Sequence, residues 1–274
     1  MGGIVEIRQG DAPLLVSIPH TGTEIPPDIE AGFVSPWLAR KDTDWRIERL
    51  YGFAGEFGAT VLRATHSRSV IDVNRDPSGA SLYPGQATTG LCPIETFDGE
   101  PLYRPGRAPD AFEIDRRRRL YFHPYHAALS GELARLKQAH RRVVLFDCHS
   151  IRSVIPRLFE GELPHMNIGT NSGASCDAGF AHVVAGICDT SGFSWSSNAR
   201  FRGGWITLSH GRPALGVHAM QMELACRSYL TEPIPSVDET NWPPAYDEAK
   251  ASEMRVTLQR IFKACLSFAR RGAG

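Results

Sequence analysis

Short apolar runs bounded by turn residues recur between helical stretches along the chain. The runs predict strands over residues 14–18, 59–64, 143–147, 165–169 and 214–223. The stretches between them predict helices over residues 43–57, 114–140, 177–191 and 245–271. Strands that alternate with helices favour a buried, largely parallel sheet with helices packed on it. The pattern therefore predicts an α/β fold.

Proline and glycine change this picture in two places. The long helix predicted over 114–140 contains Pro124 and Gly131, which should kink or split it. Residues 77–109 hold much of the Pro and Gly and show little periodicity. Loops of that length in compact domains are usually functional lids or disordered segments. Because no internal repeat or interdomain linker interrupts the pattern, we expect residues 1–274 to form one domain.

Composition narrows the classes of partner and compartment. The formal net charge is zero, so nothing global favours nucleic acid or an anionic membrane as a partner. The six cysteines are scattered without a C-x-x-C pair, which is typical of a reducing compartment. The first residues lack the pattern of a signal peptide, and no apolar run approaches the roughly 18 residues of a membrane span. We therefore expect a cytoplasmic protein that acts on a small molecule.

Two histidines stand where predicted strands run out. The run LLVSIPH reaches His20, and VVLFDCHS reaches His149. In open α/β sheets, sites gather beyond the carboxyl ends of strands, so we expect the two side chains to converge. Catalytic zinc typically takes three protein ligands, often two histidines and one carboxylate, and leaves a position for water. The alternative for each histidine is a core residue satisfied by a backbone carbonyl.

Two carboxylates compete for the third ligand position. Glu24 follows His20 by four residues but precedes a Pro-Pro pair in an extended loop. Asp44, in KDTDW, stands at the start of a predicted helix, where its orientation can be fixed. We favour Asp44 and a single zinc ion, although the same ligand set also admits iron or cobalt.

The sequence gives weaker evidence for two other sites, a second metal site and a nucleophilic cysteine. His123 and His126 in YFHPYH lie three residues apart, but Pro124 between them disturbs a shared helix face, so His126 is kept as a supporting or substrate contact only. Cys148 precedes His149 directly, and adjacent side chains on a strand point to opposite faces. The sequence therefore disfavours a cysteine nucleophile activated by His149.

The segment SRSVIDVNRDP contains several side chains that can bind an anion. It holds Arg68, Asp72, Asn74 and Arg75 within eight residues, and arginine forks bind carboxylates in a bidentate way. Arg202 adds a further candidate beside a Gly-Gly pair that allows close backbone approach. We expect Arg68, Asn74, Arg75 and Arg202 to bind substrate; a buried network of structural ion pairs is the alternative.

A general base is expected at the end of the last predicted strand. Amide cleavage at zinc needs a group that moves protons from water to the leaving nitrogen, and glutamate is the usual choice. Glu223 ends the apolar stretch LGVHAMQMEL, so its side chain is placed to enter the same cleft. A surface or helix-capping glutamate is the alternative.

The ordered set PHTG, DTDWRIERLY, SRSVIDVNRDP, HPYH, DCHS, RGGWIT and QMEL, from about residue 10 to 232, resembles the N-formylglutamate amidohydrolase family. Each motif alone is weak, but the ordered set is fairly specific. The resemblance implies a phosphorylase/hydrolase-like, three-layer α/β/α fold with a mixed, mostly parallel sheet, similar to zinc carboxypeptidases. It also implies hydrolysis of N-formyl-L-glutamate to formate and L-glutamate, the last step of one route of histidine degradation.

The resemblance also implies roles for individual residues. His20 and His149 become metal ligands, Asp44 the favoured carboxylate ligand and Glu223 the general base, while the zinc-carboxypeptidase arrangement keeps Glu24 open. One position departs from the family pattern, because His210 stands where the family often has Tyr before Gly-Arg-Pro. A hydrolase for another N-acyl acidic amino acid, and a metabolite-binding protein without catalysis, are the alternative functions.

Overall fold

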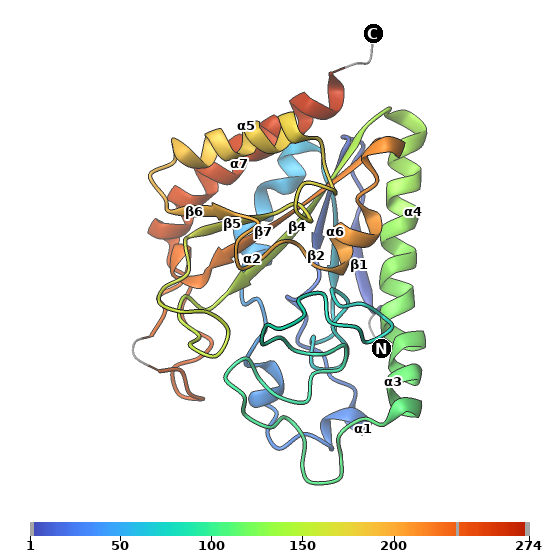
Figure 1. The fold of residues 1–274 in the computed structure, drawn as a ribbon, viewed down its shortest axis with the longest axis vertical. Helices are drawn as coiled ribbons and strands as arrows, with labels where there is room; N and C mark the ends of the chain where they lie inside the picture. Colours follow the sequence, from blue (N-terminus) through green and yellow to red (C-terminus); the bar gives the residue numbers. More distant parts are fainter. Residues whose placement is uncertain (1–2, 234–235, 272–274) are drawn as a thin grey trace.

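The computed structural model describes residues 3–233 and 236–271, and within them seven strands form one mixed sheet (Figure 1). The strand order is β1-β3-β2-β4-β7-β5-β6. The strands are β1 (Val5–Arg8), β2 (Leu14–Ile18), β3 (Thr60–Ala64), β4 (Val143–Ile151), β5 (Met166–Gly169), β6 (Trp195–Ser197) and β7 (Val217–Ala225). The central strands β3, β2, β4 and β7 run parallel, whereas β1 is antiparallel to β3, and β5 is antiparallel to β7 and parallel to β6. The expected mixed, mostly parallel sheet is confirmed.

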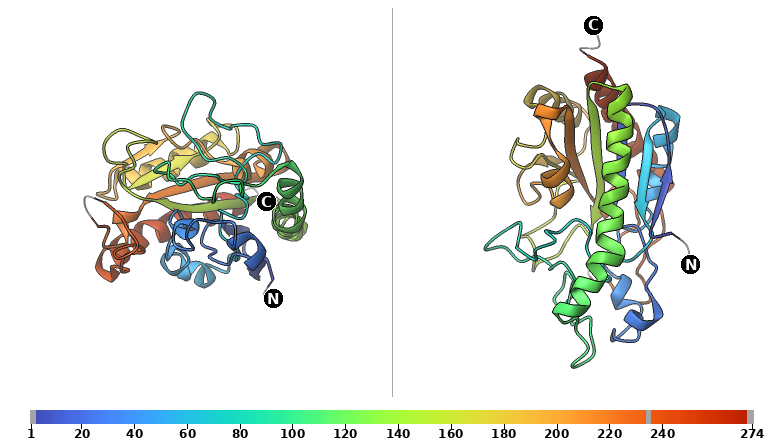
Figure 2. Two further views of the ribbon diagram at one scale, coloured as in Figure 1. Left: turned by 90° about the horizontal axis from the view of Figure 1, so that it is seen from below. Right: turned by 90° about the vertical axis from the view of Figure 1, so that its right-hand side faces the viewer.

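Helices cover both faces of the sheet, which gives the expected three layers. The α-helices are α1 (Pro27–Glu30), α2 (Ile47–Leu50), α3 (Ala111–Arg117), α4 (His123–Ala139), α5 (Ala178–Asp189), α6 (Trp205–His210) and α7 (Glu248–Arg270). Apolar side chains of α2, α5 and α7 share one core with one face of the sheet, and those of α4 and α6 share a second core with the other face. Figure 2 shows α4 running lengthwise along the sheet. No helix within the described residues is long and apolar enough to cross a membrane.

The predicted elements differ from the structure mainly where glycine and proline intervene. The helix predicted over 43–57 breaks into α2 and a 3-10 helix, Gly52–Phe57, which ends at Gly58 in the left-handed region. The helix predicted over 114–140 is α3, a π-helical turn at Arg118–Phe122, and α4. The irregular turn therefore stands just before Pro124, whereas Gly131 leaves α4 intact. The short elements β1, β6 and α6 were not predicted.

The irregular segment 77–109 lies beyond the carboxyl ends of the central strands. All of its residues are described, and they contain isolated backbone pairings, such as Glu95 with Pro101, but no helix or strand. In Figure 1 the segment is drawn in teal and green below the sheet. It therefore covers the edge at which sites gather in α/β folds.

Candidate active site

His20 and His149 meet as predicted, although His149 does not end its strand. β4 continues to Ile151 because its pairing with β7 runs on through His149–Glu223 to Ile151–Ala225. His20 lies in the turn two residues after β2. Both side chains are buried, and their Nδ1 atoms are 3.2 Å apart. Parallel neighbouring strands thus bring together two residues that are 129 positions apart.

The buried carboxylate of Asp44 completes a three-residue cluster. Its Oδ2 lies 3.4 Å from His149 Nδ1 and 3.9 Å from His20 Nδ1. Two ligand atoms bound to one tetrahedral zinc lie roughly 3.3 Å apart, given metal–ligand distances of about 2.1 Å. The three atoms therefore have the spacing that a single ion requires.

The outer nitrogen of each histidine donates to a buried carboxylate. His20 Nε2 lies 2.8 Å from Asp72 Oδ1, and His149 Nε2 lies 2.8 Å from Asp147 Oδ2. Since a carboxylate accepts, each Nε2 carries the proton. Each Nδ1 then points its lone pair at the shared centre unless it binds a second proton. Histidine ligands of metals are held by carboxylates in this way, which fixes the tautomer and raises the basicity of the ligand atom.

The two histidines of the cluster differ in their pKa shifts, because burial and the charge of Arg68 lower the pKa of His20. Burial disfavours the imidazolium of His149, but the charge of Asp147 and the hydrogen bonds to Asp147 and Asp44 raise its pKa well above the usual value. Asp44 Oδ1 is buried and has no hydrogen-bond partner among the described residues. A donor set of two imidazoles and a carboxylate with an unsatisfied oxygen suits a divalent metal ion.

Backbone contacts, rather than a helix cap, fix the position of Asp44. Its N–H donates to the His20 carbonyl at 3.0 Å, and its Oδ2 accepts from the backbone N–H of Ser150 at 3.0 Å. The first residue of α2 is Ile47, so Asp44 stands ahead of the helix. The side chain of Glu24 is exposed, and its backbone pairs with His66 at the sheet edge. Of the two candidate ligands, Asp44 is the one that lies in the cluster.

Glu223 faces the cluster from the neighbouring strand. It pairs with His149 in the β4–β7 register and lines the same pocket. Gln221 Nε2 donates to Glu223 Oε2 at 3.0 Å, and the backbone N–H of Gly204 donates to the side-chain oxygen Oε1 of Gln221 at 2.8 Å. Burial raises the pKa of Glu223 to about 7. The carboxyl group is therefore placed to take and return a proton near neutral pH.

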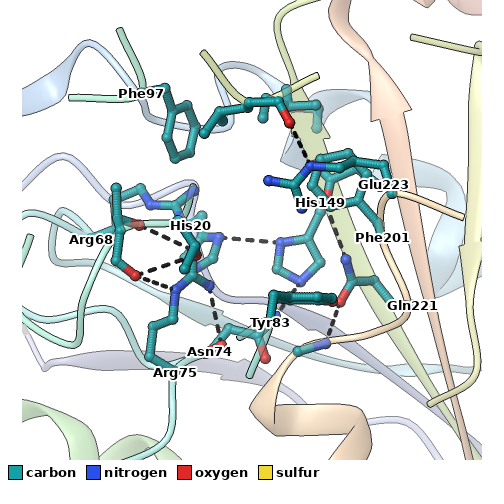
Figure 3. A pocket seen from close by; sticks show the side chains of 17 residues that line it. His20, Arg68, Asn74, Arg75, Tyr83, Phe97, His149, Phe201, Gln221 and Glu223 are labelled. Carbon is teal, nitrogen blue, oxygen red and sulfur yellow. Dashed lines mark hydrogen bonds between the residues drawn. The ribbon is translucent and has the colours of Figure 1, made fainter. Parts of the chain in front are cut away.

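Three arginines line the same pocket, two of them from the predicted segment. Figure 3 shows Arg68 and Arg75 on one side, with Gln221 and Glu223 on the other. Arg68 forms an ion pair with Asp72 at 2.6 Å, and its guanidinium lies 4.8 Å from the centre of the Phe97 ring. Burial alone would raise the pKa of Asp72, but the charges of Arg75, His20 and Arg68 hold it well below its usual range.

The third pocket arginine is Arg200, and the prediction of Arg202 is not supported. The side chain of Arg202 is exposed and does not line the pocket. Its N–H donates to the Tyr83 hydroxyl at 3.2 Å and its carbonyl accepts from the N–H of Asn171 at 2.6 Å, so the backbone is held while the side chain points away. Arg200 Nη2 donates to the carbonyl of Ala87 at 2.9 Å, which ties the pocket to the irregular segment.

The side chain of Asn74 forms hydrogen bonds within the protein, which was not expected of a residue predicted to bind substrate. Its Oδ1 accepts from the N–H of Ile206 at 2.8 Å, and its Nδ2 donates to Asp147 Oδ2 at 3.3 Å while lining the pocket. A Cβ added to Gly204 would lie 2.4 Å from the Asn74 amide group. The close approach expected of the Gly-Gly pair is therefore confirmed, and it serves the packing of Asn74.

The family model for N-formylglutamate amidohydrolase matches residues 12–230. That match covers most of the chain and contains every residue of the cluster and pocket described above.

The chain belongs to the N-formylglutamate amidohydrolase family.

Individual relatives agree with this membership. The chain is 43% identical over 271 residues to N-formylglutamate deformylase of Pseudomonas aeruginosa, a match that covers 98% of each chain. It is 42% identical over 269 residues to the enzyme of the same name from Pseudomonas putida, covering 98% of this chain and 97% of that one. The crystal structure of N-formylglutamate amidohydrolase from Ralstonia eutropha JMP134 has a TM-score of 0.79 at 24% identity, covering 99% of this chain and 100% of that one, and shows the shared fold.

Sequence reasoning missed several residues of this family member's site. Asp147 stands two positions before His149 on the same strand, so the period of two could have revealed that their side chains share a face. No sequence signal distinguished Arg200 from Arg202, or pointed to Tyr83. The expected exclusion of Cys148 agrees with its place in the core on the opposite face, where burial raises its pKa well above the usual value.

Proposed function

We propose that this chain hydrolyses N-formyl-L-glutamate to formate and L-glutamate, using one zinc ion held by His20, Asp44 and His149. The observation that carries the proposal is that one pocket is lined by the two histidines of the cluster, a buried glutamate and three arginines. The names of the two Pseudomonas relatives, which match this chain over nearly their whole length, support the substrate.

A bound divalent ion would polarise the formyl carbonyl and acidify the attacking water. Glu223 takes a proton from that water as its oxygen adds to the formyl carbon. The same carboxyl group then delivers the proton to the amino nitrogen as the carbon–nitrogen bond breaks. Formate and the free amine leave, so the atoms of one water molecule are divided between the two products. Burial of Glu223 suits both steps, because a carboxyl group with a pKa of about 7 accepts and releases protons readily.

The arginines account for the acidic amino acid portion. N-formyl-L-glutamate carries two carboxylates, and guanidinium groups bind carboxylates through paired N–H donors. Arg68, Arg75 and Arg200 line the pocket, and Asp72 already offsets part of their charge. The two negative charges of the substrate balance the remaining positive charge of the arginines. Binding of the distant carboxylate orients the formyl group toward Glu223.

Formate release from a panel of N-formyl and N-acetyl amino acids tests the proposal, together with metal analysis of the purified protein. We expect one zinc per chain and a clear preference for N-formyl-L-glutamate in kcat/KM. A preference for another N-acyl acidic amino acid would overturn the substrate, and absence of a stoichiometric metal with no formate release would favour a binding protein.

A matched pair of arginine variants tests the pocket. Arg200→Ala removes a pocket guanidinium and should raise KM for N-formyl-L-glutamate at least about tenfold, whereas Arg202→Ala removes an exposed one and should leave KM unchanged. Equal effects of the two variants would contradict the assignment of Arg200.

A further inference from the structure

A second pair of histidines joins α4 to α6 outside the pocket. His126 Nδ1 lies 2.9 Å from His210 Nε2, and the two rings are stacked, with an angle of 4° between their planes. The other nitrogen of His126, Nε2, lies 2.8 Å from the carbonyl oxygen of Val73. Neither histidine lines the pocket, so the departure from the family pattern at His210 does not place a substrate contact there.

The partners fix where the protons lie in this pair. A carbonyl oxygen only accepts, so His126 Nε2 donates to Val73. A neutral His126 then has a lone pair on Nδ1 and accepts from the N–H of His210 Nε2. The hydrogen bonds thus run in one direction, from His210 through His126 to Val73. A second proton on His126 would set two N–H groups against each other across 2.9 Å unless His210 moved its own proton to Nδ1.

The chain of hydrogen bonds ends on the residue before Asn74. Asn74 is held on its other side by α6, because its carbonyl accepts from Trp205 at 3.2 Å and its side-chain oxygen accepts from Ile206 at 2.8 Å. His210 is the last residue of that same helix. The two histidines therefore connect both ends of α6 with the turn that presents Asn74 to Asp147.

We propose that His126 and His210 form a clamp that positions Asn74, and through it the Asp147–His149 pair, for metal binding and catalysis. His126 and His210 are positioning residues, since neither reaches the pocket. The proposal rests on the proposed function only for its catalytic readout, because the position of Asn74 and the affinity for zinc can be measured without turnover.

The surroundings keep the clamp neutral. Burial lowers the pKa of His126 to about 4 and that of His210 to about 4. The charged and titratable groups that face the pair are Asp147 on β4, His123 and Tyr125 on α4, and Arg212 after α6. Asp147 favours protonation, and His123 and Arg212 oppose it. Both histidines are therefore neutral at neutral pH, as the direction of these hydrogen bonds requires.

Variants at His126 separate positioning from general packing. His126→Leu removes both hydrogen bonds, whereas His126→Gln keeps a donor for Val73 and an acceptor for His210. His210→Phe keeps a stacked ring and removes only the donor to His126. The control is His182→Gln, an exposed histidine on α5. Each protein is compared by the NMR signal of the Asn74 side-chain amide without zinc, by zinc affinity in competition with a chelator, and by kcat and KM.

The clamp predicts a shifted Asn74 signal, zinc affinity weakened by roughly tenfold and a lower kcat at nearly constant KM for His126→Leu, with smaller changes of the same kind for His210→Phe. His126→Gln should restore all three near pH 7. An unchanged Asn74 signal and zinc affinity in folded His126→Leu would overturn the proposal, as would equal damage in folded His126→Gln. If the wild type releases no formate, the substrate proposal fails while the first two measurements still test the clamp.

Discussion

Two pairs of histidines in this protein have similar spacing and opposite chemistry. The inner nitrogens are 3.2 Å apart in His20 and His149, and 2.9 Å apart in His126 and His210. The first pair lies at the carboxyl ends of the central strands, and the second joins two helices on one face of the sheet. The separation between the rings therefore does not explain what each pair does.

The group that holds the outer nitrogen decides the difference. Asp72 and Asp147 hold the outer nitrogens of the first pair, so both inner nitrogens point their lone pairs at a centre that a proton or a metal ion must fill. The carbonyl of Val73 holds the outer nitrogen of His126, which leaves a donor facing an acceptor inside the second pair. The second pair therefore satisfies its own hydrogen bonds without a metal ion.

The pKa shifts follow this division for His149 but not for His20, because burial and the charge of Arg68 lower the pKa of His20 despite Asp72 and Asp44. Despite burial, Asp147 and Asp44 raise the pKa of His149 well above its usual value, whereas burial lowers the pKa of His126 to about 4. A nearby carboxylate raises the pKa of a buried imidazole, whereas burial and a nearby guanidinium lower it. The arrangement of the ligand atoms, rather than the pKa shifts, therefore distinguishes the two pairs.

The largest effect is expected from removing one ligand of the first pair. His149→Ala leaves two of the three ligand atoms, so zinc affinity should fall at least about a hundredfold and turnover by roughly four orders of magnitude. His126→Gln, which changes the other pair, should keep one zinc per chain. Metal analysis after dialysis checks both, and loss of zinc from His126→Gln alone would reverse the comparison.

Replacing Glu223, the proposed general base, should separate the loss of turnover from the loss of metal binding. Glu223→Gln keeps the size of the side chain and a partner for Gln221, so zinc content should stay intact while kcat falls by roughly two to four orders of magnitude. Formate release in a single-turnover experiment measures the loss. Retained activity, or loss of zinc, would exclude Glu223 as the base.

The pH dependence of the wild type gives a second test of Glu223. A general base acts when deprotonated, so kcat/KM should rise with pH through its pKa. Burial sets that pKa at about 7 without a metal, and a bound cation lowers it. We expect the acid limb of the profile at or below about pH 7. A limb clearly above that value would contradict the assignment.

A smaller effect is expected from the carboxylates behind the histidines. Asp147→Asn removes the charge that holds His149 Nε2 but keeps a similar shape, and such changes typically weaken metal affinity by about 10–100-fold. Competition with a chelator measures the affinity. The control is Asp189→Asn, which should leave the affinity for zinc unchanged. The side chain of Asp189 is exposed, and within the described residues its one hydrogen bond is with Trp195.

A last prediction concerns stability in acid. The pKa of His126 and of His210 lies at about 4 in the folded protein and near 6.5 when unfolded, so the unfolded chain binds more protons between these values. The free energy of unfolding should therefore fall as pH drops from about 6.5 to about 4, by on the order of 1 kcal/mol per pH unit for each histidine. Urea denaturation across this window should give a shallower slope for His126→Gln. An equal slope would show that His126 is not held neutral.

The fold was largely predictable because the spacing of apolar residues indicates which strands and helices are buried. The predicted strands over 14–18 and 143–147 became β2 and β4, and the helix over 245–271 became α7. The elements that were not predicted are short, or they depend on pairing with residues distant in the sequence. β1 and β6 have four and three residues, and their pairing along the sheet edges, rather than local pattern, makes them strands.

The site was predictable where strand ends determine direction and less so in the loops. His20, His149 and Glu223 come together because parallel strands place them at one edge of the sheet. Arg200 enters the pocket instead of Arg202 because contacts with Tyr83 and Asn171 turn the backbone, and these partners are distant in sequence. Contacts of that kind leave no periodic signal.

Anomalous diffraction at the zinc edge, on crystals of the protein purified with zinc, tests the central contrast between the two histidine pairs most directly. The account predicts one peak about 2.0–2.2 Å from His20 Nδ1, His149 Nδ1 and an oxygen of Asp44, and none between His126 and His210. No peak at the first pair, or a peak at the second, would contradict it.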